Sequence, residues 1–465
     1  MHLLANRLST IDIQKGTIVI CILCIAISII WLKIQNPFLI LAISIVPISI
    51  IFVLWKPFLM VLLFVVFSFF RLHEVFPQIY NFKIPLLLSL ASLFSLFWHV
   101  AISKKIEVYC TKDLVSISIF FLLVAIGVIA ASNRPVAIEY FKGIYWKIAL
   151  MTYAIAFLTR QAKDFSLAAK IITISGTLVG FTAIYNKANG IGLVEETRVT
   201  IGRQIGSVLG DPNDLALVLM FPASFAISLL ITKGIPRSSK MLGLVSVITL
   251  FSAIIATQSR GGLLGILTVF GIYGYRKTKN KALFISVAAI SAVLLYFIAG
   301  ISGRSSGGTA EDGIDASAMG RLYAWEAAVG MAAHNPLTGV GLDNFYSNYY
   351  YYSPHWDGLN HAVHSTWFGV LAETGFLGFA VFVFNIILLL KTSYRCLITI
   401  ELHISTVDPA LVAASQAVFA GLIGTVVSGT FLTQGFTWPI YILSALVVAI
   451  SRWTDNILLK KVSAR

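Results

Sequence analysis

Charged residues are scarce in this chain. Of its 465 residues, 12% are Asp, Glu, Lys or Arg and 58% are hydrophobic. A soluble domain carries about twice that charged fraction, so the composition excludes a single water-soluble globule. Acidic residues are the scarcer sign, 20 against 34 basic residues, which gives a net charge of +14. We attribute the basic excess to membrane topology and anionic lipid, and we expect no nucleic-acid partner.

Metal-binding patterns are missing as well. The sequence has no H-E-x-x-H pair, which is the signature of a zinc site on a helix. Its polar segments also lack the D-x-D pair that metal-dependent sugar-nucleotide transferases use. We therefore expect neither a metal site nor a cofactor.

What the chain has instead is a series of apolar runs. Each approaches the 17–25 residues, roughly, that a helix needs to cross a bilayer. They predict an all-α integral membrane protein with 12–14 transmembrane helices. The second and third runs are short and adjacent, so they can also form one re-entrant pair. The predicted spans are 17–33, 38–54, 57–71, 84–101, 113–131, 143–159, 167–185, 213–231, 241–257, 261–275, 281–301, 365–390, 410–429 and 437–451.

The basic residues set the predicted orientation. With the N-terminus in the cytoplasm, 22 of the 34 Lys and Arg residues fall on the cytoplasmic side and 12 elsewhere, as the positive-inside rule requires. Both termini are then cytoplasmic, and segments 186–212 and 302–362 are external. All four cysteines fall in the membrane or on the cytoplasmic side, so no disulfide is expected in the external segments. We treat residues 1–465 as a single polytopic membrane domain.

The external segment 302–362 is polar and aromatic, and this locates the functional face of so apolar a chain. Residues 303–313 are rich in Gly, Ser and Asp and should be flexible. Residues 320–333 predict a helix along the membrane interface, which Asn335-Pro336 should end. Its predicted apolar stripe consists of Leu322, Trp325, Val329 and Ala332.

Three aromatic residues of this segment are candidates for substrate contact, namely Tyr323, Trp325 and Tyr349. Aromatic planes suit stacking on sugar rings or lipid headgroups, while anchoring at the membrane interface is the alternative explanation. Gly339 and Gly341 predict a tight turn before the run of tyrosines.

Arg260 lies in the break T-Q-S-R-G-G between two adjacent apolar runs. A cation at that depth is costly and usually has a partner. Gly261 and Gly262 let a ligand approach the backbone, and the following helix N-terminus adds positive potential. These features predict an anion site, and an arginine bound to phospholipid is the alternative.

Two further arginines lie in the external segments. Arg203 precedes the turn D-P-N-D, in which Asn213 or Asp214 is expected to cap the next helix. Arg203 is a candidate anion ligand unless it pairs with Glu195 or the acid after it. Arg321 lies in the first turn of the interfacial helix, where a cation opposes the helix dipole, and this indicates a function.

His364 stands where the external segment re-enters the membrane, three residues after His361. A neutral imidazole with a pKa near ~6.5 can take a proton from a hydroxyl group. His361 is a candidate for substrate binding beside it. A hydrogen-bonding role at the interface is the alternative. Glu373, within the next apolar run, is expected to pair with an arginine or to orient a histidine.

Three elements of this kind occur in order along the chain. They are Ser259-Arg260-Gly261-Gly262, then Gly320-Arg321 with Trp325, Pro336, Gly339 and Gly341, then His364-Ser365-x9-Gly375-x-x-Gly378. Together they resemble the O-antigen ligase and polymerase superfamily of bacterial inner membranes, over roughly residues 140–450. The last element is similar to the signature of O-antigen ligases, with Ser where Asn is common.

The resemblance implies a metal-independent, inverting membrane glycosyltransferase whose active site faces the periplasm. Its donor would be a glycan on undecaprenyl diphosphate, and its acceptor would be lipid A–core oligosaccharide or a related glycolipid. The resemblance implies that His364 is the catalytic histidine and that Arg260 and Arg321 bind the diphosphate, with Arg203 as a further arginine. Residues 303–313 and the interfacial helix would form a lid over the donor.

Other functions stay open. An O-antigen polymerase would use the same donor to extend a lipid-linked glycan. A protein O-oligosaccharyltransferase would modify Ser or Thr, but the sequence indicates no large soluble C-terminal domain of the kind that would favour it. A transporter or flippase predicts several charges near mid-membrane, where this chain has only Glu373. Polar residues clustered on one face favour an enzyme that works among membrane lipids.

Overall fold

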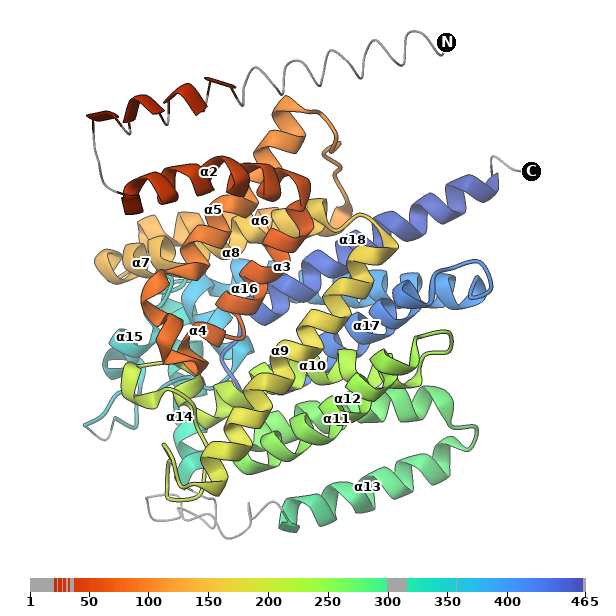
Figure 1. The fold of residues 1–465 in the computed structure, drawn as a ribbon. Coiled ribbons are helices and arrows are strands. Elements are labelled where there is room, and N and C mark those ends of the chain that lie inside the picture. The colour runs from red at the N-terminus through yellow and green to blue at the C-terminus, as the bar shows by residue number, and fades with distance from the viewer. Residues whose placement is uncertain are drawn as a thin grey trace.

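The computed structural model describes residues 21–22, 24–26, 28–30, 32–33, 37–298, 316–356 and 358–462. In these ranges the chain forms helices and no β-strand, so the prediction of an all-α membrane protein is confirmed. Figure 1 shows long helices gathered side by side in one bundle. The predicted flexible stretch 303–313 and parts of the first and eleventh predicted spans lie outside the described residues.

The helices follow the predicted apolar runs closely. In chain order the α-helices are α2 (Pro37–Trp55), α3 (Pro57–Ser68), α4 (Leu72–Val75), α5 (Ile84–Phe97), α6 (Lys112–Ala130), α7 (Arg134–Tyr140), α8 (Trp146–Leu158), α9 (Ala162–Ala188), α10 (Pro212–Ile231), α11 (Arg237–Thr257), α12 (Arg260–Lys277), α13 (Lys281–Ile298), α14 (Ala316–His334), α15 (Phe345–Tyr352), α16 (Thr366–Leu402), α17 (Pro409–Gly429) and α18 (Trp438–Val462). Short 3-10 segments are η1 (Pro77–Phe82), η4 (Arg203–Ile205) and η5 (Val208–Gly210), and η2 (Trp98–Ile102) and η3 (Phe141–Tyr145) are π-helical.

The part of the chain that the structure describes holds fewer candidate membrane spans than the 12–14 expected. Among the described residues, eight helices are long and apolar enough to cross a membrane, or up to nine if a bent pair counts as one span. Helix α12 shows why some predicted spans fall short. It has only 18 residues, and it begins at Arg260 and ends in Arg276 and Lys277, so charge occupies both of its ends.

The bent pair is the one that the sequence marked as a possible re-entrant pair. Residues 45–55 of α2 and helix α3 meet at an angle of 99° across Lys56. Pro57 begins α3 and removes a backbone N–H donor at the junction. The chain therefore turns sharply instead of continuing as one rod.

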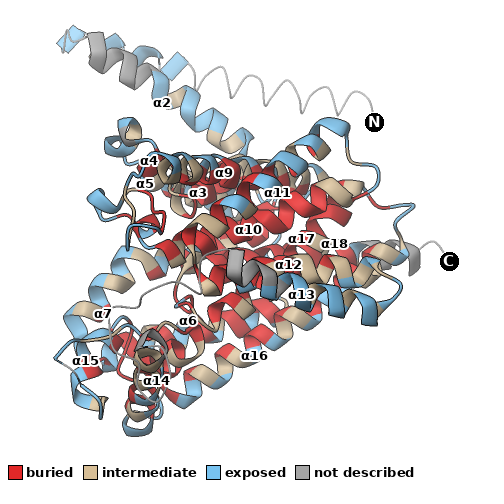
Figure 2. Ribbon diagram, turned by 90° about the horizontal axis from the view of Figure 1, so that it is seen from below, coloured by how far each residue is buried: buried red, intermediate tan, exposed pale blue. Residues whose placement is uncertain are grey.

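Helix α10 forms the centre of the bundle. Its most apolar 18-residue window is 83% buried, and it packs against α9, α11, α12 and α17. Figure 2 shows buried residues concentrated on α10 and the neighbouring helices, with exposed residues along the outer ones. Helix α10 is apolar on all sides, which is typical of a helix in a protein core or in a membrane.

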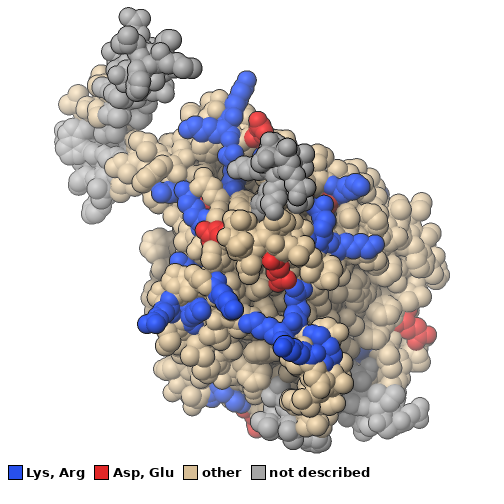
Figure 3. Space-filling view, turned by 90° about the vertical axis from the view of Figure 1, so that its right-hand side faces the viewer, with Lys and Arg blue, Asp and Glu red and all other residues tan. Residues whose placement is uncertain are grey.

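The two ends of the bundle differ in charge. In Figure 1, α4, α14 and α15 lie at the left end, and the loops after α10, α12 and α16 lie at the right end. Figure 3 looks onto that right end and shows many Lys and Arg side chains with few Asp and Glu. The positive-inside rule predicts that such a surface faces the cytoplasm. The predicted external segments therefore share the opposite end.

Helix α14 corresponds to the predicted interfacial helix and ends at His334, directly before Asn335-Pro336. Its buried face differs from the predicted stripe, because Leu322 and Val329 are each 45% exposed. The buried residues are mostly small: Ala324, Ala327, Ala328, Met331 and Ala332. Small side chains allow a close approach between helices, and α14 uses them to pack against α16.

Helix α16 is bent at Gly375, whose φ of 67° and ψ of −172° are not helical. The bend exposes the N–H of Phe376, which donates to the carbonyl of Pro336 at 2.8 Å, and the N–H of Val340 donates to Ala372 at 2.8 Å. Gly339 completes this contact with a φ of +62°. We call the contact between residues 336–340 and the bend of α16 the clasp. It fixes the segment after α14 to the helix that follows His364.

Candidate active site

The N-termini of α10, α12 and α16 lie at the same end of the bundle. Asp211 caps α10, because its carboxylate accepts from the N–H groups of Asn213 at 2.7 Å and Asp214 at 3.3 Å. The prediction that Asn213 or Asp214 is the cap was wrong. The proline at the first helical position follows the cap residue Asp211, which is the usual order. Because Asp211 is the cap, the side chain of Asn213 is available for another contact.

Asn213 joins α10 to α12. Its side-chain oxygen accepts from Ser259 Oγ at 2.9 Å and from Arg198 Nη2 at 3.0 Å. Ser259 caps α12 by accepting from the N–H of Gly262 at 3.2 Å. This network sets the position of Arg260, the first residue of α12, which is half-buried.

The segment 430–437 joins α12 to α16. Leu432 packs closely on Gly261 of α12, and its carbonyl accepts from the hydroxyl of Thr366 at 2.7 Å. The same hydroxyl accepts from the N–H of Gln434 at 2.9 Å. Arg260 is the first residue of α12, and His364 precedes the cap of α16. Both therefore lie at helix N-termini, where unpaired N–H groups and the helix dipoles favour an anion.

His364 has a left-handed backbone with a φ of 42°. For a residue other than glycine this conformation costs roughly 1–3 kcal/mol, and it persists only where its surroundings enforce it. Trp325 of α14 supplies part of that enforcement. Its indole N–H donates to the carbonyl of Val363 at 3.0 Å, and its ring stacks on Phe368 at 4.9 Å. Trp325 is thus a positioning residue for His364 as well as a candidate substrate contact.

The charge around His364 favours its neutral form. Burial lowers the pKa of His364, and the guanidinium of Arg321 lowers it further. Asp211 acts in the opposite direction, and His361 adds a smaller lowering effect. These four side chains, from α14, the segment before α16 and the cap of α10, therefore act on one another electrostatically. An imidazole that is neutral at pH 7 can accept a proton.

The other aromatic candidates lie around this group. The ring of Tyr349 contacts that of His361 with centroids 5.4 Å apart, and Tyr349 is fully buried. Tyr323 stacks on His355 at 4.0 Å. Tyr349 thus packs against His361 from the buried side, while Tyr323 is half-buried on α14.

Two predicted pairings differ in the structure. Arg203 is exposed and its Nη1 donates to the carbonyl of Gly210 at 3.4 Å. The arginine that pairs with Glu195 is Arg198, whose Nη1 lies 3.7 Å from the Glu195 carboxylate. Within the described part of the chain, Glu373 pairs with neither an arginine nor a histidine. Its carboxylate accepts from the N–H groups of Asp343 at 2.9 Å and Phe345 at 3.4 Å, because the N-terminus of α15 needs acceptors that its own residues do not supply.

Residues 244–383 match the protein-family model described as O-antigen ligase. This match supports membership of the O-antigen ligase superfamily. The matched region contains Arg260, Arg321, His361 and His364 together with the clasp, whereas Arg203 lies before it. No curated protein matches the chain.

The match to the O-antigen ligase family supports a general kind of activity. Its members are ligase or polymerase-like enzymes of the glycosyltransferase kind, and they imply a lipid-linked glycan and a glycolipid or polymer acceptor. The apolar helices make this member a multi-pass membrane protein.

Sequence reasoning missed two residues of this O-antigen ligase-like site. Arg198 is 3% exposed and joins Asn213 to the carbonyl of Thr257, which its Nε reaches at 3.1 Å. Asp211 lies beside His364 electrostatically. The polar sequence around Arg198 gives no sign of its burial, and only the fold brings Asp211 to the histidine.

Proposed function

We propose that this chain is an O-antigen ligase of a bacterial inner membrane. It transfers a glycan from undecaprenyl diphosphate to lipid A–core oligosaccharide at the periplasmic face, with both termini in the cytoplasm and without a metal ion. Residues 1–465 act as one membrane domain with the external segment 302–362. The observation that carries the proposal is the half-buried His364 beside Arg321, within the region that matches the ligase family.

The proposed reaction forms one bond and breaks another at C1 of the reducing-end sugar. His364 takes the proton of the acceptor hydroxyl as its oxygen bonds to C1. The bond from C1 to the diphosphate oxygen breaks, and undecaprenyl diphosphate leaves with the electron pair. Attack from the side opposite to the leaving group inverts the configuration at C1.

The arginines stabilise the departing diphosphate. Arg is always charged, and its planar fork matches phosphate oxygens with two parallel hydrogen bonds. Arg260 and Arg321 are assigned this role, with Arg203 at the rim. Positive charge fixed before the reaction lowers the barrier most where negative charge develops. Two or three guanidinium groups thus supply the charge that a divalent cation provides in other transferases.

Arg321 has a second effect through His364. In the absence of donor, burial and the positive charge of Arg321 both lower the pKa of His364 and favour the neutral imidazole. A bound diphosphate offsets that charge, which raises the affinity of His364 for a proton when a hydroxyl group must be deprotonated. His364 is therefore unprotonated before the donor binds, and it becomes a stronger base once the donor is bound.

Transfer with purified components tests the proposal. The full chain in lipid nanodiscs is incubated with an undecaprenyl-diphosphate-linked glycan and lipid A–core, and the products are separated by mass. A glycan-bearing lipid A–core product is expected. If lipid A–core stays unmodified while the lipid-linked glycan grows longer, the enzyme is a polymerase and the ligase assignment is wrong.

The pH dependence of transfer should follow the pKa of His364. Because burial and Arg321 lower this pKa, the rate should fall only as the pH drops below the ordinary histidine value of about 6.5. Arg321→Gln removes one lowering influence, so the acid side of the profile should move to higher pH. Initial rates measured between about pH 5 and 8 provide the test.

Asp211→Asn is the matched control for this shift. Asp211 raises the pKa of His364, so its neutralisation should move the acid side to lower pH, opposite to the Arg321 variant. Asn is as good a helix cap as Asp, so α10 keeps its N-terminus. Two variants that move the profile in the same direction, or leave it in place, contradict the role of His364 as the base.

A further inference from the structure

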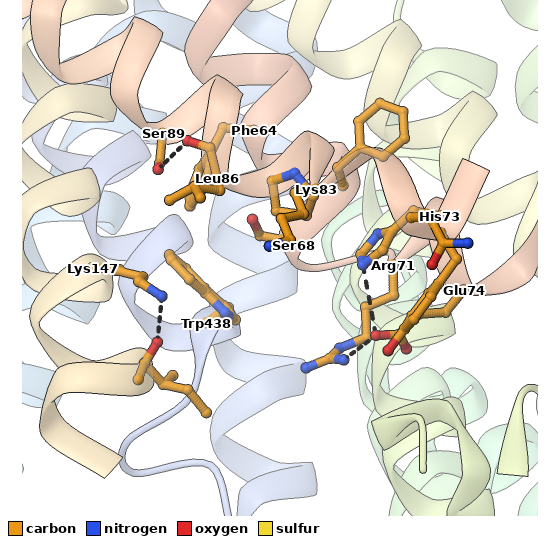
Figure 4. A pocket seen from close by; sticks show the side chains of 16 residues that line it. Phe64, Ser68, Arg71, His73, Glu74, Lys83, Leu86, Ser89, Lys147 and Trp438 are labelled. Atoms are coloured by element: carbon orange, nitrogen blue, oxygen red, sulfur yellow. Dashed lines mark hydrogen bonds and ion pairs between the residues drawn. The ribbon is translucent and has the colours of Figure 1, made fainter. Parts of the chain in front are cut away.

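A pocket of about 470 Å³ lies outside the region that matches the family, between α3, α4, α5, η3 and the start of α18. Figure 4 shows Arg71 and Lys147 on opposite sides of it, with the ring of Trp438 between them. Lys83, the residue before α5, also lines it. The sequence indicated only a scaffold in this part of the chain, so the pocket is a finding of the structure.

The pocket is positively charged. Its lining contains three permanent cations, Arg71, Lys83 and Lys147, against one carboxylate, Glu74. Burial lowers the pKa of His73, which also lines the pocket and is therefore neutral at pH 7. The lining thus carries two positive charges in excess, three minus one, and an anion would offset them.

Glu74 holds Arg71 in place without using its binding capacity. The carboxylate is 7% exposed and pairs with Arg71 Nη1. It also accepts from the hydroxyl of Ser207, in the external segment before α10. The pair occupies one of the five N–H donors of a guanidinium. Arg71 is therefore oriented by the protein, with further donors for an oxygen-rich ligand.

The backbone around the pocket is strained at the cationic positions. Arg71 and Lys83 have φ values of 50° and 48°, a left-handed conformation that is costly for residues other than glycine and that gathers at functional sites. On the far wall, Gly143 lies in the π-helical segment η3 and accepts from Lys147 Nζ at 2.6 Å. Single π-helical turns also occur frequently at functional sites. Three independent backbone features thus place cations around one cavity.

The surroundings of the pocket are those of a lipid and not of a soluble anion. Leu86, at its edge, is 48% exposed. It begins an exposed apolar face that continues along α5 through Leu87, Leu90, Phe94 and Phe97, at 61%, 57%, 42% and 61%. Helix α5 belongs to a candidate membrane span of which 22% is buried. Acyl chains can follow this face while a headgroup occupies the pocket.

We propose that this pocket binds the phosphate group of a membrane phospholipid, with Arg71, Lys83 and Lys147 as its ligands and the acyl chains along α5. The site goes beyond the transfer reaction and does not depend on it. It lies near the transfer site, because Arg71 acts electrostatically on Asp214, next to the cap of α10. A bound phospholipid would thus hold α4 and the segment around Ser207 at the membrane surface.

Native mass spectrometry of the detergent-solubilised full chain tests the proposal. Phosphatidylglycerol is compared with a diacylglycerol that has the same acyl chains and no phosphate, and with inorganic phosphate alone. The double variant Lys83→Gln/Lys147→Gln should bind phosphatidylglycerol about tenfold more weakly or worse, since it removes two positive charges that donate hydrogen bonds to the phosphate group. This variant leaves the pair of Arg71 with Glu74 intact.

Lys233→Gln/Lys279→Gln is the matched control, because it removes two exposed lysines at the other end of the bundle. It should retain the tight binding of phosphatidylglycerol. Equal binding by the pocket variant and the wild type overturns the proposal, and so does diacylglycerol binding as tight as that of phosphatidylglycerol. Binding of inorganic phosphate without preference for the lipid assigns the pocket to a soluble anion and overturns the lipid. None of these results depends on glycan transfer.

Discussion

Replacing His364 with alanine should lower the rate of glycan transfer by about 10²–10⁴-fold, the usual contribution of a general base. The change should leave the fold intact, because His364 lies before α16 and Ser365 provides its cap position. Removal of the side chain also leaves the hydrogen bond from Trp325 to the carbonyl of Val363 in place. Initial rates with purified protein, donor and acceptor measure the effect.

His403→Ala is the control for this variant. His403 lies at the other end of the same helix, where its Nδ1 is 2.7 Å from the carbonyl oxygen of Thr399. Its rate should equal that of the wild type. Transfer by the His364 variant at more than about a tenth of the wild-type rate, with a normal melting temperature, would be too fast for a lost general base. The proposed mechanism would then be wrong.

Gly375→Ala should destabilise the protein by more than about 3 kcal/mol, because two penalties combine. The φ of 67° and ψ of −172° belong to a region that is essentially restricted to glycine. A methyl group would also lie 2.5 Å from the carbonyl oxygen of Pro336. That oxygen accepts the hydrogen bond from Phe376, so it cannot move away without opening the clasp.

The loss should be visible as a lower midpoint of thermal unfolding in detergent, followed by size-exclusion chromatography, together with a lower yield. Gly271→Ala in α12 is the control. A methyl group there meets no atom within 4 Å, and Ala is favoured over Gly inside a helix by roughly 0.5–1 kcal/mol. If both variants unfold at the wild-type temperature, the clasp does not hold α16 in its bent form.

The helices were predictable because apolar length is a local property. The predicted span 213–231 is α10, and the stop at Asn335-Pro336 is the end of α14. The bent form of α2 and α3 followed from a short polar break. The buried face of α14 was not predictable, because its alanines are buried by α16 and not by their own hydrophobicity.

The sequence predicted those site residues that lie within a short sequence motif. The pattern around His364 and the S-R-G-G break marked their positions, although their roles in transfer stay predictions. The partners could not be found in this way. Glu373 binds backbone groups 28 and 30 positions away in the sequence, and Asp211 acts on His364 from another helix. Such pairings depend on how the helices pack, which a linear pattern does not contain.

The nine residues between Ser365 and Gly375 fix the distance and the rotation between the bend of α16 and the segment that carries His364. One end is held by the clasp and the other carries the imidazole. A helix turns about 100° and rises about 1.5 Å for each residue. A single insertion or deletion in this stretch would therefore swing His364 through about a quarter of a revolution, away from Arg321, while every side chain of the site was still present. Natural length variation should be confined to loops outside this interval.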